Sequence, residues 1–300
     1  TALTLIMCLI AFAIGTRPQL PLLLAANRDE ALDRPTLALH RWHTPAGVGV
    51  IGGRDGRDHG TWLACAGPDA PPHAANRVAM LTNVRHGHDT TAWPRSRGEL
   101  PLVWLNGTPL EALLARLDPA AYGAFNLVVG DVATGAWHWV TNRDDQHHTT
   151  LHCQALEPGV YGLSNARLDT PWPKTLALRT ALEQALSAGT ANADTLPSTS
   201  PAPISATEAA LWDTLANPHT WPDADLPATG VPLEWERALS AVWVDHPPSY
   251  GTRTSALLAV HAVGGDSPGW HWRMQEQTWR PTPQPVPREE HWHTLASGGR

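Results

Sequence analysis

The hydrophobic and polar positions at the start of the chain alternate in blocks that predict a β-hairpin. Two apolar runs, residues 3–14 and 20–26, are separated by segment 15–18, which contains a glycine and a proline. Glycine tolerates positive φ and proline fixes its own φ, so together they interrupt strands and favour tight turns. We therefore expect two paired strands with a turn centred near Arg17.

A hairpin brings residues that are distant in sequence to the same end of a sheet. With that turn, Cys8 lies opposite Ala26, and the polar sequence Asn27-Arg28-Asp29 arrives at the same end. A neighbouring Arg stabilises a thiolate, and a carboxylate can hold that Arg or an amine in place. This end of the hairpin is therefore a candidate site for cysteine chemistry.

A purely structural interpretation of the same residues stays open. Cysteine is among the most often buried residue types, and one within an apolar strand is usually a packing residue. An Arg-Asp sequence at the end of a strand commonly forms a surface ion pair. A register slip of one residue would also move Cys8 to the other face of the sheet.

Further along the chain, short apolar segments predict strands and longer amphipathic segments predict helices. Strands come in pairs, helices dominate the middle, and strands return, which favours an α+β domain with largely antiparallel sheets. We expect one domain over residues 1–280, a mobile loop over 188–204 and a surface tail over 281–300. The expected strands are 48–51, 61–65, 77–82, 125–130, 136–141, 151–152, 160–163, 240–244, 254–263 and 269–274, and the expected helices are 100–105, 109–117, 176–186 and 205–216.

Composition excludes several classes of partner. A formal net charge of −7 with no basic run disfavours nucleic acid and anionic membrane surfaces. No apolar run approaches the ~20 residues of a membrane-spanning helix. The three cysteines are too few and too scattered for a disulfide framework, which indicates a reducing compartment and hence a cytoplasmic protein.

Several motifs, in this order and over nearly the whole chain, resemble the NRDE family, which is the transport and Golgi organisation family. The resemblance implies an N-terminal-nucleophile hydrolase-like fold, an αββα four-layer sandwich with two mainly antiparallel sheets between helices. The motifs are Met7-Cys8-Leu9-Ile10, Asn27-Arg28-Asp29-Glu30, Gly52-Gly53-Arg54-Asp55, Gly60-Thr61-Trp62-Leu63, Leu81-Thr82-Asn83-Val84-Arg85, Ser96-Arg97-Gly98-Glu99-Leu100, Gly162-Leu163-Ser164-Asn165, Asp169-Thr170-Pro171-Trp172-Pro173-Lys174 and Tyr250-Gly251-Thr252-Arg253.

The resemblance also implies roles for particular residues. In cysteine members of the wider superfamily the nucleophile is a cysteine exposed at the amino terminus, which here is Cys8. Its own α-amine then takes the thiol proton. Arg28 and Asp29 are similar to residues that hold the cysteine and the substrate, and Arg253 is similar to a late active-site arginine.

Four further polar residues complete the expected site. Asn83 or Asn165 supplies an oxyanion-stabilising or amine-orienting donor, and we count both among the catalytic candidates. Asn27 and Arg85 are the expected substrate-binding residues, and no metal site is expected.

The segment before Met7 departs from the family pattern. Residues 1–6 precede Met7 in this sequence, and Cys8 has no free amine while they are attached. Either translation begins at Met7, or the segment is cleaved, or the protein does not perform this chemistry.

These observations leave functions of different classes. The first is a cysteine amidohydrolase or acyl-transfer enzyme that acts on a small amide or thioester and requires no cofactor. The second is a non-catalytic carrier of haem, lipid or acyl-CoA on the same fold, and the third is a protein that keeps the fold without activity. The candidate haem ligands are His86, His88, His147, His148, His152, Cys153, His291 and His293.

Overall fold

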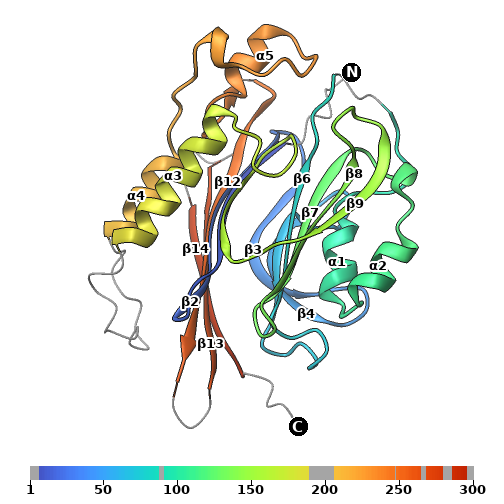
Figure 1. Cartoon of the computed structure of the whole chain (residues 1–300), viewed down its shortest axis with the longest axis vertical. Helices are drawn as coiled ribbons and strands as arrows, with labels where there is room; N and C mark the ends of the chain where they lie inside the picture. Colours follow the sequence, from blue (N-terminus) through green and yellow to red (C-terminus); the bar gives the residue numbers. More distant parts are fainter. Residues whose placement is uncertain are drawn as a thin grey trace.

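Two antiparallel β-sheets stacked face to face form the centre of the molecule (Figure 1). The computed structural model describes residues 7–87, 91–188, 206–246, 248–264, 268–279 and 286–295. Over these residues the first sheet has the strand order β10-β1-β2-β12-β13-β14, with β11 paired to β12. Its strands are β1 (Met7–Arg17), β2 (Leu20–Ala31), β10 (Gly159–Leu163), β11 (Asp245–His246), β12 (Tyr250–Val263), β13 (Gly269–Thr278) and β14 (Val286–Leu295).

The second sheet follows the chain order from β3 to β9. Each neighbouring pair is antiparallel, as expected for strands joined by short turns. Its strands are β3 (Thr36–His43), β4 (Gly49–Asp55), β5 (Leu63–Ala66), β6 (Arg77–Asn83), β7 (Phe125–Asp131), β8 (Ala136–Arg143) and β9 (Thr149–Ala155).

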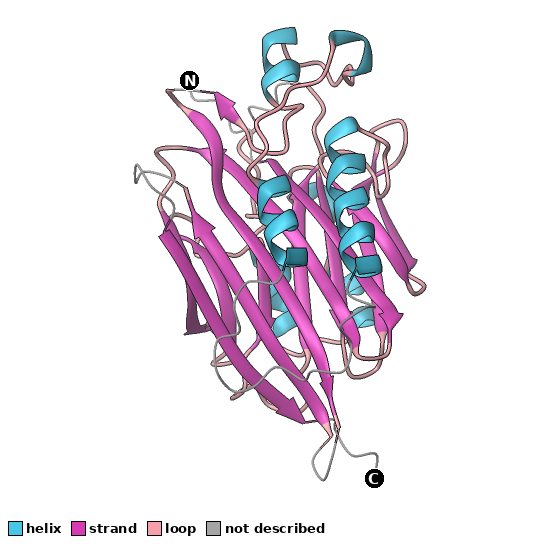
Figure 2. Cartoon of the chain, turned by 90° about the vertical axis from the view of Figure 1, so that its left-hand side faces the viewer, coloured by secondary structure: helices cyan, strands magenta, loops and turns pink. Residues whose placement is uncertain are grey.

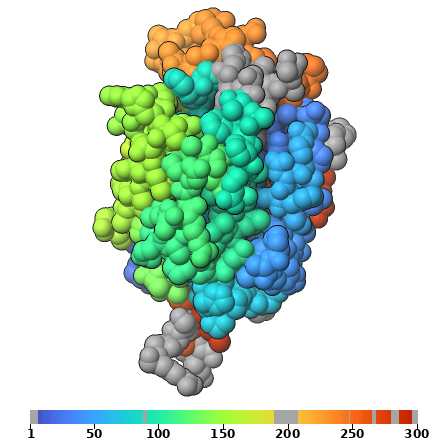
Figure 3. Space-filling model, turned by 90° about the vertical axis from the view of Figure 1, so that its right-hand side faces the viewer, coloured from blue at the N-terminus to red at the C-terminus, as the bar shows by residue number. Residues whose placement is uncertain are grey.

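Helices cover the outer face of each sheet. Helices α3 and α4 lie across the first sheet (Figure 2), and α1 and α2 cover the second, the face seen in Figure 3. The α-helices are α1 (Glu99–Leu105), α2 (Leu110–Arg116), α3 (Pro173–Ala188), α4 (Ala206–Leu215) and α5 (Leu233–Ala238). The molecule is therefore an α+β protein with two antiparallel sheets between helix layers, as the sequence predicts.

Alternation along the strands builds separate cores on the two faces of the first sheet. Cys8, Ile10 and Phe12 point between the sheets, where they join residues such as Leu63 and Met80 of the second sheet. The intervening residues of β1 face α3 and α4. This period of two is the ordinary consequence of strand geometry, and it gives neighbouring residues of β1 different surroundings.

The register of the hairpin differs from the prediction. β1 continues to Arg17, the turn falls at residues 18–19, and a bulge between Ile14 and Arg17 shifts the pairing. Gly15 takes φ 59° within that bulge, so it serves the bulge and not the turn. Cys8 therefore lies opposite Arg28, not Ala26, while the shift by two residues keeps Cys8 on the expected face.

Other elements differ from the prediction for identifiable reasons. Residues 240–244 form a turn and bends and not a strand. The Val242 carbonyl accepts from the Asn27 amide side chain, and the Trp243 amide donates to the Asn217 carbonyl, so neither group is paired with a neighbouring strand. Strands β9 and β10 belong to different sheets, and β3 and α5 were not predicted.

Within the expected tail, Val286–Leu295 forms β14, because Trp292 stacks on Trp272 in the core with ring centroids 5.4 Å apart. The expected mobile loop, apart from Ala188, and the start of the 205–216 helix lie outside the described residues. The one-domain boundary stays a prediction. Among the described helices, none has the length and apolar character needed to cross a bilayer.

Candidate active site

Cys8 and Arg28 lie side by side where β1 begins and β2 ends. They are directly paired across the two strands, and both face the space between the sheets. The structure thus brings together the thiol and the guanidinium that the sequence placed at one end of the hairpin.

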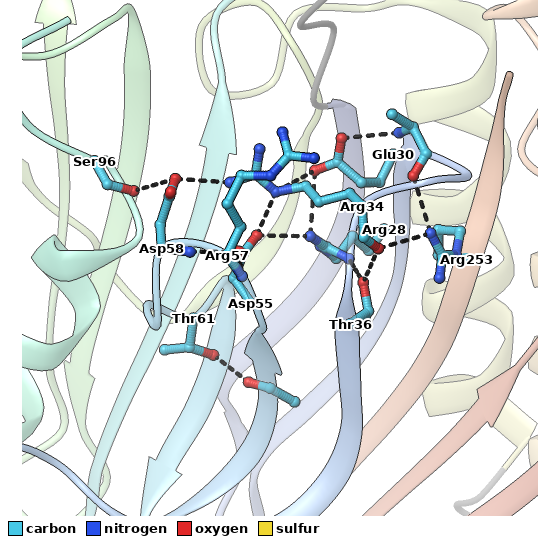
Figure 4. Close-up of polar contacts among 12 residues, drawn as sticks. Arg28, Glu30, Arg34, Thr36, Asp55, Arg57, Asp58, Thr61, Ser96 and Arg253 are labelled. Atoms are coloured by element: carbon cyan, nitrogen blue, oxygen red, sulfur yellow. Dashed lines mark hydrogen bonds and ion pairs between the residues drawn. The ribbon is translucent and has the colours of Figure 1, made fainter.

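Three carboxylates hold Arg28 and its neighbour Arg34 in fixed positions (Figure 4). Arg28 donates to Glu30 and to Asp55, each at 3.2 Å, and Arg34 donates to Asp55 at 2.6 Å and to Asp58 at 2.7 Å. Burial opposes ionisation of Asp55, but hydrogen bonds from Arg34 and from two backbone amides outweigh it and lower the pKa of Asp55. The network fixes the guanidinium groups at the entrance to the site.

A cavity of about 380 Å³ opens beside this network, within the range for small-molecule sites. Its wall combines aromatic and cationic groups, which suit a substrate with an apolar part and an anionic or polar part. The lining includes Cys8, Arg28, Trp62, Asn83, Trp93 and Arg97.

Burial keeps the thiol of Cys8 protonated while Met7 is attached. Cys8 is 1% exposed, and burial raises the pKa of its thiol well above the ordinary value despite the opposing charge of Arg28. The expected activation by Arg28 alone is therefore insufficient, because Arg28 is itself neutralised by Glu30 and Asp55. A proton acceptor is needed to make this thiol a nucleophile.

Asp29 lies next to the peptide bond between Met7 and Cys8, on the other face of β2. It pairs with Met7 in the sheet, and its Oδ1 accepts a hydrogen bond from Thr252 at 2.6 Å. Its Oδ2 is buried and has no hydrogen-bond partner among the described residues. Burial raises the pKa of Asp29 to about 6, although the charge of Lys174 opposes that shift.

Asn83 and Asn165 both lie near Cys8, but they are held differently. Asn83 lines the cavity, whereas Asn165 Nδ2 donates to the Asn83 carbonyl at 3.0 Å. Ser164 Oγ donates to the Cys8 carbonyl at 3.2 Å and lies 3.2 Å from Asn165 Oδ1. Asn165 therefore positions the segment that carries Asn83.

Arg253 is bound away from the thiol. Its Nη1 donates to the carbonyls of Ala31, Leu32 and Arg34 at 2.9–3.1 Å, which fixes the turn after β2. This arrangement gives Arg253 an indirect place in the site, through Arg34.

Asn27 and Arg85 also lie away from the cavity that Cys8 lines. The Asn27 amide donates to Leu215 and Val242 carbonyls, each at 2.8 Å, on the helix side of the sheet. Arg85 pairs with Glu236 at 3.0 Å and contacts the sulfur of Met7 at 3.6 Å. The structure does not bring these two expected substrate-binding residues to the thiol.

The sequence prediction omitted residues that complete the site. Arg34 and Asp55 were not among the expected site residues, and nothing in their sequence spacing shows that they meet. Lys174, in the first turn of α3, is 2% exposed, and its Nζ has no hydrogen-bond partner in the described part of the chain. One signal was available, because Lys174 is the only lysine in the sequence.

The candidate haem ligands are dispersed. His86 stacks on His147 with ring centroids 4.0 Å apart, whereas His291 and His293 stack on His271 in the first sheet. His88 lies outside the described residues. Over the described ranges, no group of three or more His, Cys, Asp or Glu side chains is arranged to hold a metal ion.

Comparison with known proteins gives one consistent family. Residues 7–273 match the family model described as "Transport and Golgi organisation 2". The "Transport and Golgi organization protein 2 homolog" of Bos taurus is 31% identical over 277 residues, covering 86% of this chain and 90% of the relative. The homolog of Homo sapiens is 29% identical with the same coverage, and "Transport and Golgi organization protein 2" of Drosophila melanogaster is 28% identical over 85% of this chain and 88% of its own.

Proposed function

The chain belongs to the Transport and Golgi organisation 2 family, and from the geometry of its site we propose that it is a cysteine hydrolase or acyltransferase of the N-terminal-nucleophile type. Its substrate is a small amide or thioester, and its nucleophile is Cys8 once the bond between Met7 and Cys8 has been cut. The two sheets between helix layers support an N-terminal-nucleophile hydrolase-like fold. The free Cys8, Cys65 and Cys153 thiols fit the expected cytoplasmic location.

One observation carries the proposal. Cys8 lines a cavity of small-molecule size, and the buried Oδ2 of Asp29, opposite Met7 in the sheet, has no hydrogen-bond partner among the described residues. A buried carboxylate oxygen without a donor is costly unless a ligand or a new group satisfies it. An α-amine on Cys8 would supply such a donor.

The chemistry follows from these positions. The α-amine accepts the thiol proton, and the sulfur attacks the carbonyl carbon of the substrate. The carbonyl oxygen becomes an oxyanion that Asn83 stabilises, the leaving amine or thiol takes the proton, and an acyl thioester remains on Cys8. Water, activated by the same α-amine, hydrolyses this thioester and restores the free thiol, while an acceptor amine in place of water gives acyl transfer.

The experiment compares a chain that begins at Cys8 with one that retains Met7. Both are assayed against a panel of small fluorogenic amides and thioesters. We expect turnover only by the chain that begins at Cys8, and loss of that turnover in Cys8→Ala. Cys65→Ala is the matched control, because Cys65 is also fully buried but does not line the cavity. Equal turnover by both chains, or by Cys8→Ala, would contradict the proposal.

If the protein is instead a non-catalytic carrier of haem, lipid or acyl-CoA, we expect a different result. None of the described residues that line the Cys8 cavity is a histidine. A carrier that uses the dispersed histidines would bind haem equally well with or without Met7, and its Soret shift would disappear only in a variant that lacks all of the candidate histidines. Cys8-dependent turnover without that shift favours the enzyme.

A further inference from the structure

The only lysine of the chain is buried within the candidate site. Of the 21 Lys and Arg residues, all except Lys174 are arginines. The side chain of this single lysine is buried, with an exposed fraction of 2%. Lysine is among the residues least often buried without a partner, because its ammonium is strongly hydrated. A lone lysine in this place therefore calls for an explanation specific to its amine.

The fold holds Lys174 near the start of β1. The first turn of α3 packs directly on β10, where a Cβ on Gly162 would lie only 2.6 Å from Cγ2 of Thr175. β10 pairs with β1 through Gly162 and Ala11. The absence of a side chain at Gly162 is thus what lets this turn, and Lys174 with it, approach the strand that carries Cys8.

Lys174 and Asp29 act on each other without forming a hydrogen bond. Within the described residues, neither Nζ of Lys174 nor Oδ2 of Asp29 has a hydrogen-bond partner. Their charges nevertheless interact, since Asp29 raises the pKa of Lys174 while burial, the larger effect, lowers it to about 8. The donor Nζ of Lys174 and the acceptor Oδ2 of Asp29 are thus both left for a further polar group to bind.

We propose that Lys174 is a positioning residue that keeps the α-amine of Cys8 in its free-base form, so that this amine can take the thiol proton at neutral pH. The inference rests on the proposed function, in which Cys8 is the first residue. An α-amine has an ordinary pKa near ~8, and the carboxylate of Asp29 beside it would raise that value and keep the amine protonated. The positive charge of Lys174 offsets Asp29 and favours the neutral amine.

This role explains why lysine and not arginine occupies the position. An arginine would reach Asp29 with its planar fork and bind both carboxylate oxygens. Oδ2 would then be unable to accept a hydrogen bond from the α-amine. The compact ammonium of Lys174 contributes charge and leaves the acceptor open.

The test measures the α-amine directly in the chain that begins at Cys8. Carbon-13 labelling of cysteine reports the α-amine of Cys8 through its Cα, and labelling of lysine gives a single signal because Lys174 is the only lysine. We expect the pKa of the α-amine to rise by about one unit or more in Lys174→Met. Lys174→Gln is the second variant if Lys174→Met does not fold. Thr175→Val is the matched control, since Thr175 is buried in the same helical turn and carries no charge.

The outcomes separate this inference from the proposed function. An unchanged α-amine pKa in Lys174→Met and Lys174→Gln, or an equal change in Thr175→Val, would overturn the role of Lys174. If the chain turns over an amide, the acidic limb of the pH profile of kcat/KM in the Lys174 variants should shift to higher pH, by as much as the pKa of the α-amine rises. Absence of any Cys8-dependent turnover would end the proposed function, while the NMR titration would still decide whether Lys174 sets the protonation of this amine.

Discussion

At the scale of single residues, burial decides the protonation of Cys8 and Asp29 more than the neighbouring charges do. Cys8 has Arg28 directly across the strand, yet desolvation is the larger effect on its thiol. Asp29 is close to Lys174, yet desolvation again decides the direction of its pKa shift. For these two groups burial therefore favours the neutral form, while the ion pairs around Arg28 and Arg34 keep Asp55 ionised.

The thiol of Cys8 should react slowly in the chain that retains Met7. Burial raises its pKa, so the thiolate that reacts with iodoacetamide is scarce at pH 8. We expect Cys8 to be alkylated at least about tenfold more slowly than the partly exposed Cys153, as followed by peptide mass spectrometry. Faster labelling of Cys8 than of Cys153 would show that the thiol is already activated.

Asp29 should make stability depend on pH in a defined direction. The folded chain retains the Asp29 proton up to about pH 6, whereas the reference value is 3.8. The folded state binds more protons in that interval, so the free energy of unfolding falls as the pH rises through it. In Asp29→Asn this decline should be smaller by on the order of 2 kcal/mol between pH 4 and pH 7, measured by urea unfolding. Parallel pH profiles for the two proteins would refute the buried, protonated state.

At the scale of elements, an ion-pair network joins the end of β2 to β4 and to the loop that follows it. Asp55 accepts from both Arg28 and Arg34, so one carboxylate links two elements that the hairpin alone does not connect. The side chain of Asp55 is only 13% exposed. Breaking such a pair leaves buried charge without compensation, which costs more than the pair contributes.

Asp55→Asn should therefore destabilise the protein by about 2–4 kcal/mol in urea unfolding. Asp69→Asn is the control, because Asp69 also pairs across elements, with His43, but is 58% exposed. We expect that variant to change stability by less than about 0.5 kcal/mol. If both variants lost a similar amount of stability, the network around Arg28 would contribute no more to the free energy of unfolding than an exposed ion pair does.

Sequence periodicity located these elements better than it located their contacts. The two apolar runs and the break between them made the hairpin predictable, whereas the face on which Cys8 lies depended on a register that the sequence left open. The bulge at Gly15 was not, because glycine signals a turn and a bulge equally well. Residues 240–244 look like a strand because their apolar side chains are buried, but a side-chain amide from Asn27 binds the backbone there.

At the scale of the whole molecule, the order of strands and helices predicted an α+β protein with largely antiparallel sheets, and the resemblance of the motifs added the two-sheet arrangement. The site, by contrast, depends on contacts across long sequence separations. Asp29 meets Thr252 and Asn165 meets Asn83 only because the sheets fold together. The hairpin brought Cys8, Arg28 and Asp29 together as candidates, and the resemblance of the motifs supplied their roles and added Asn83. The resemblance did not reveal that Asn27 and Arg85 face away from the cavity, since side-chain direction at a strand end depends on register.

The central claim is that Cys8 acts as the first residue of the chain. Its most direct test is mass spectrometry of the amino-terminal tryptic peptide from protein isolated from its own cells. Because trypsin does not cut between Arg17 and Pro18, the account predicts a peptide that begins at Cys8 and ends at Arg28, with a free α-amine. A fully active protein in which every such peptide still contains the bond between Met7 and Cys8 would contradict it.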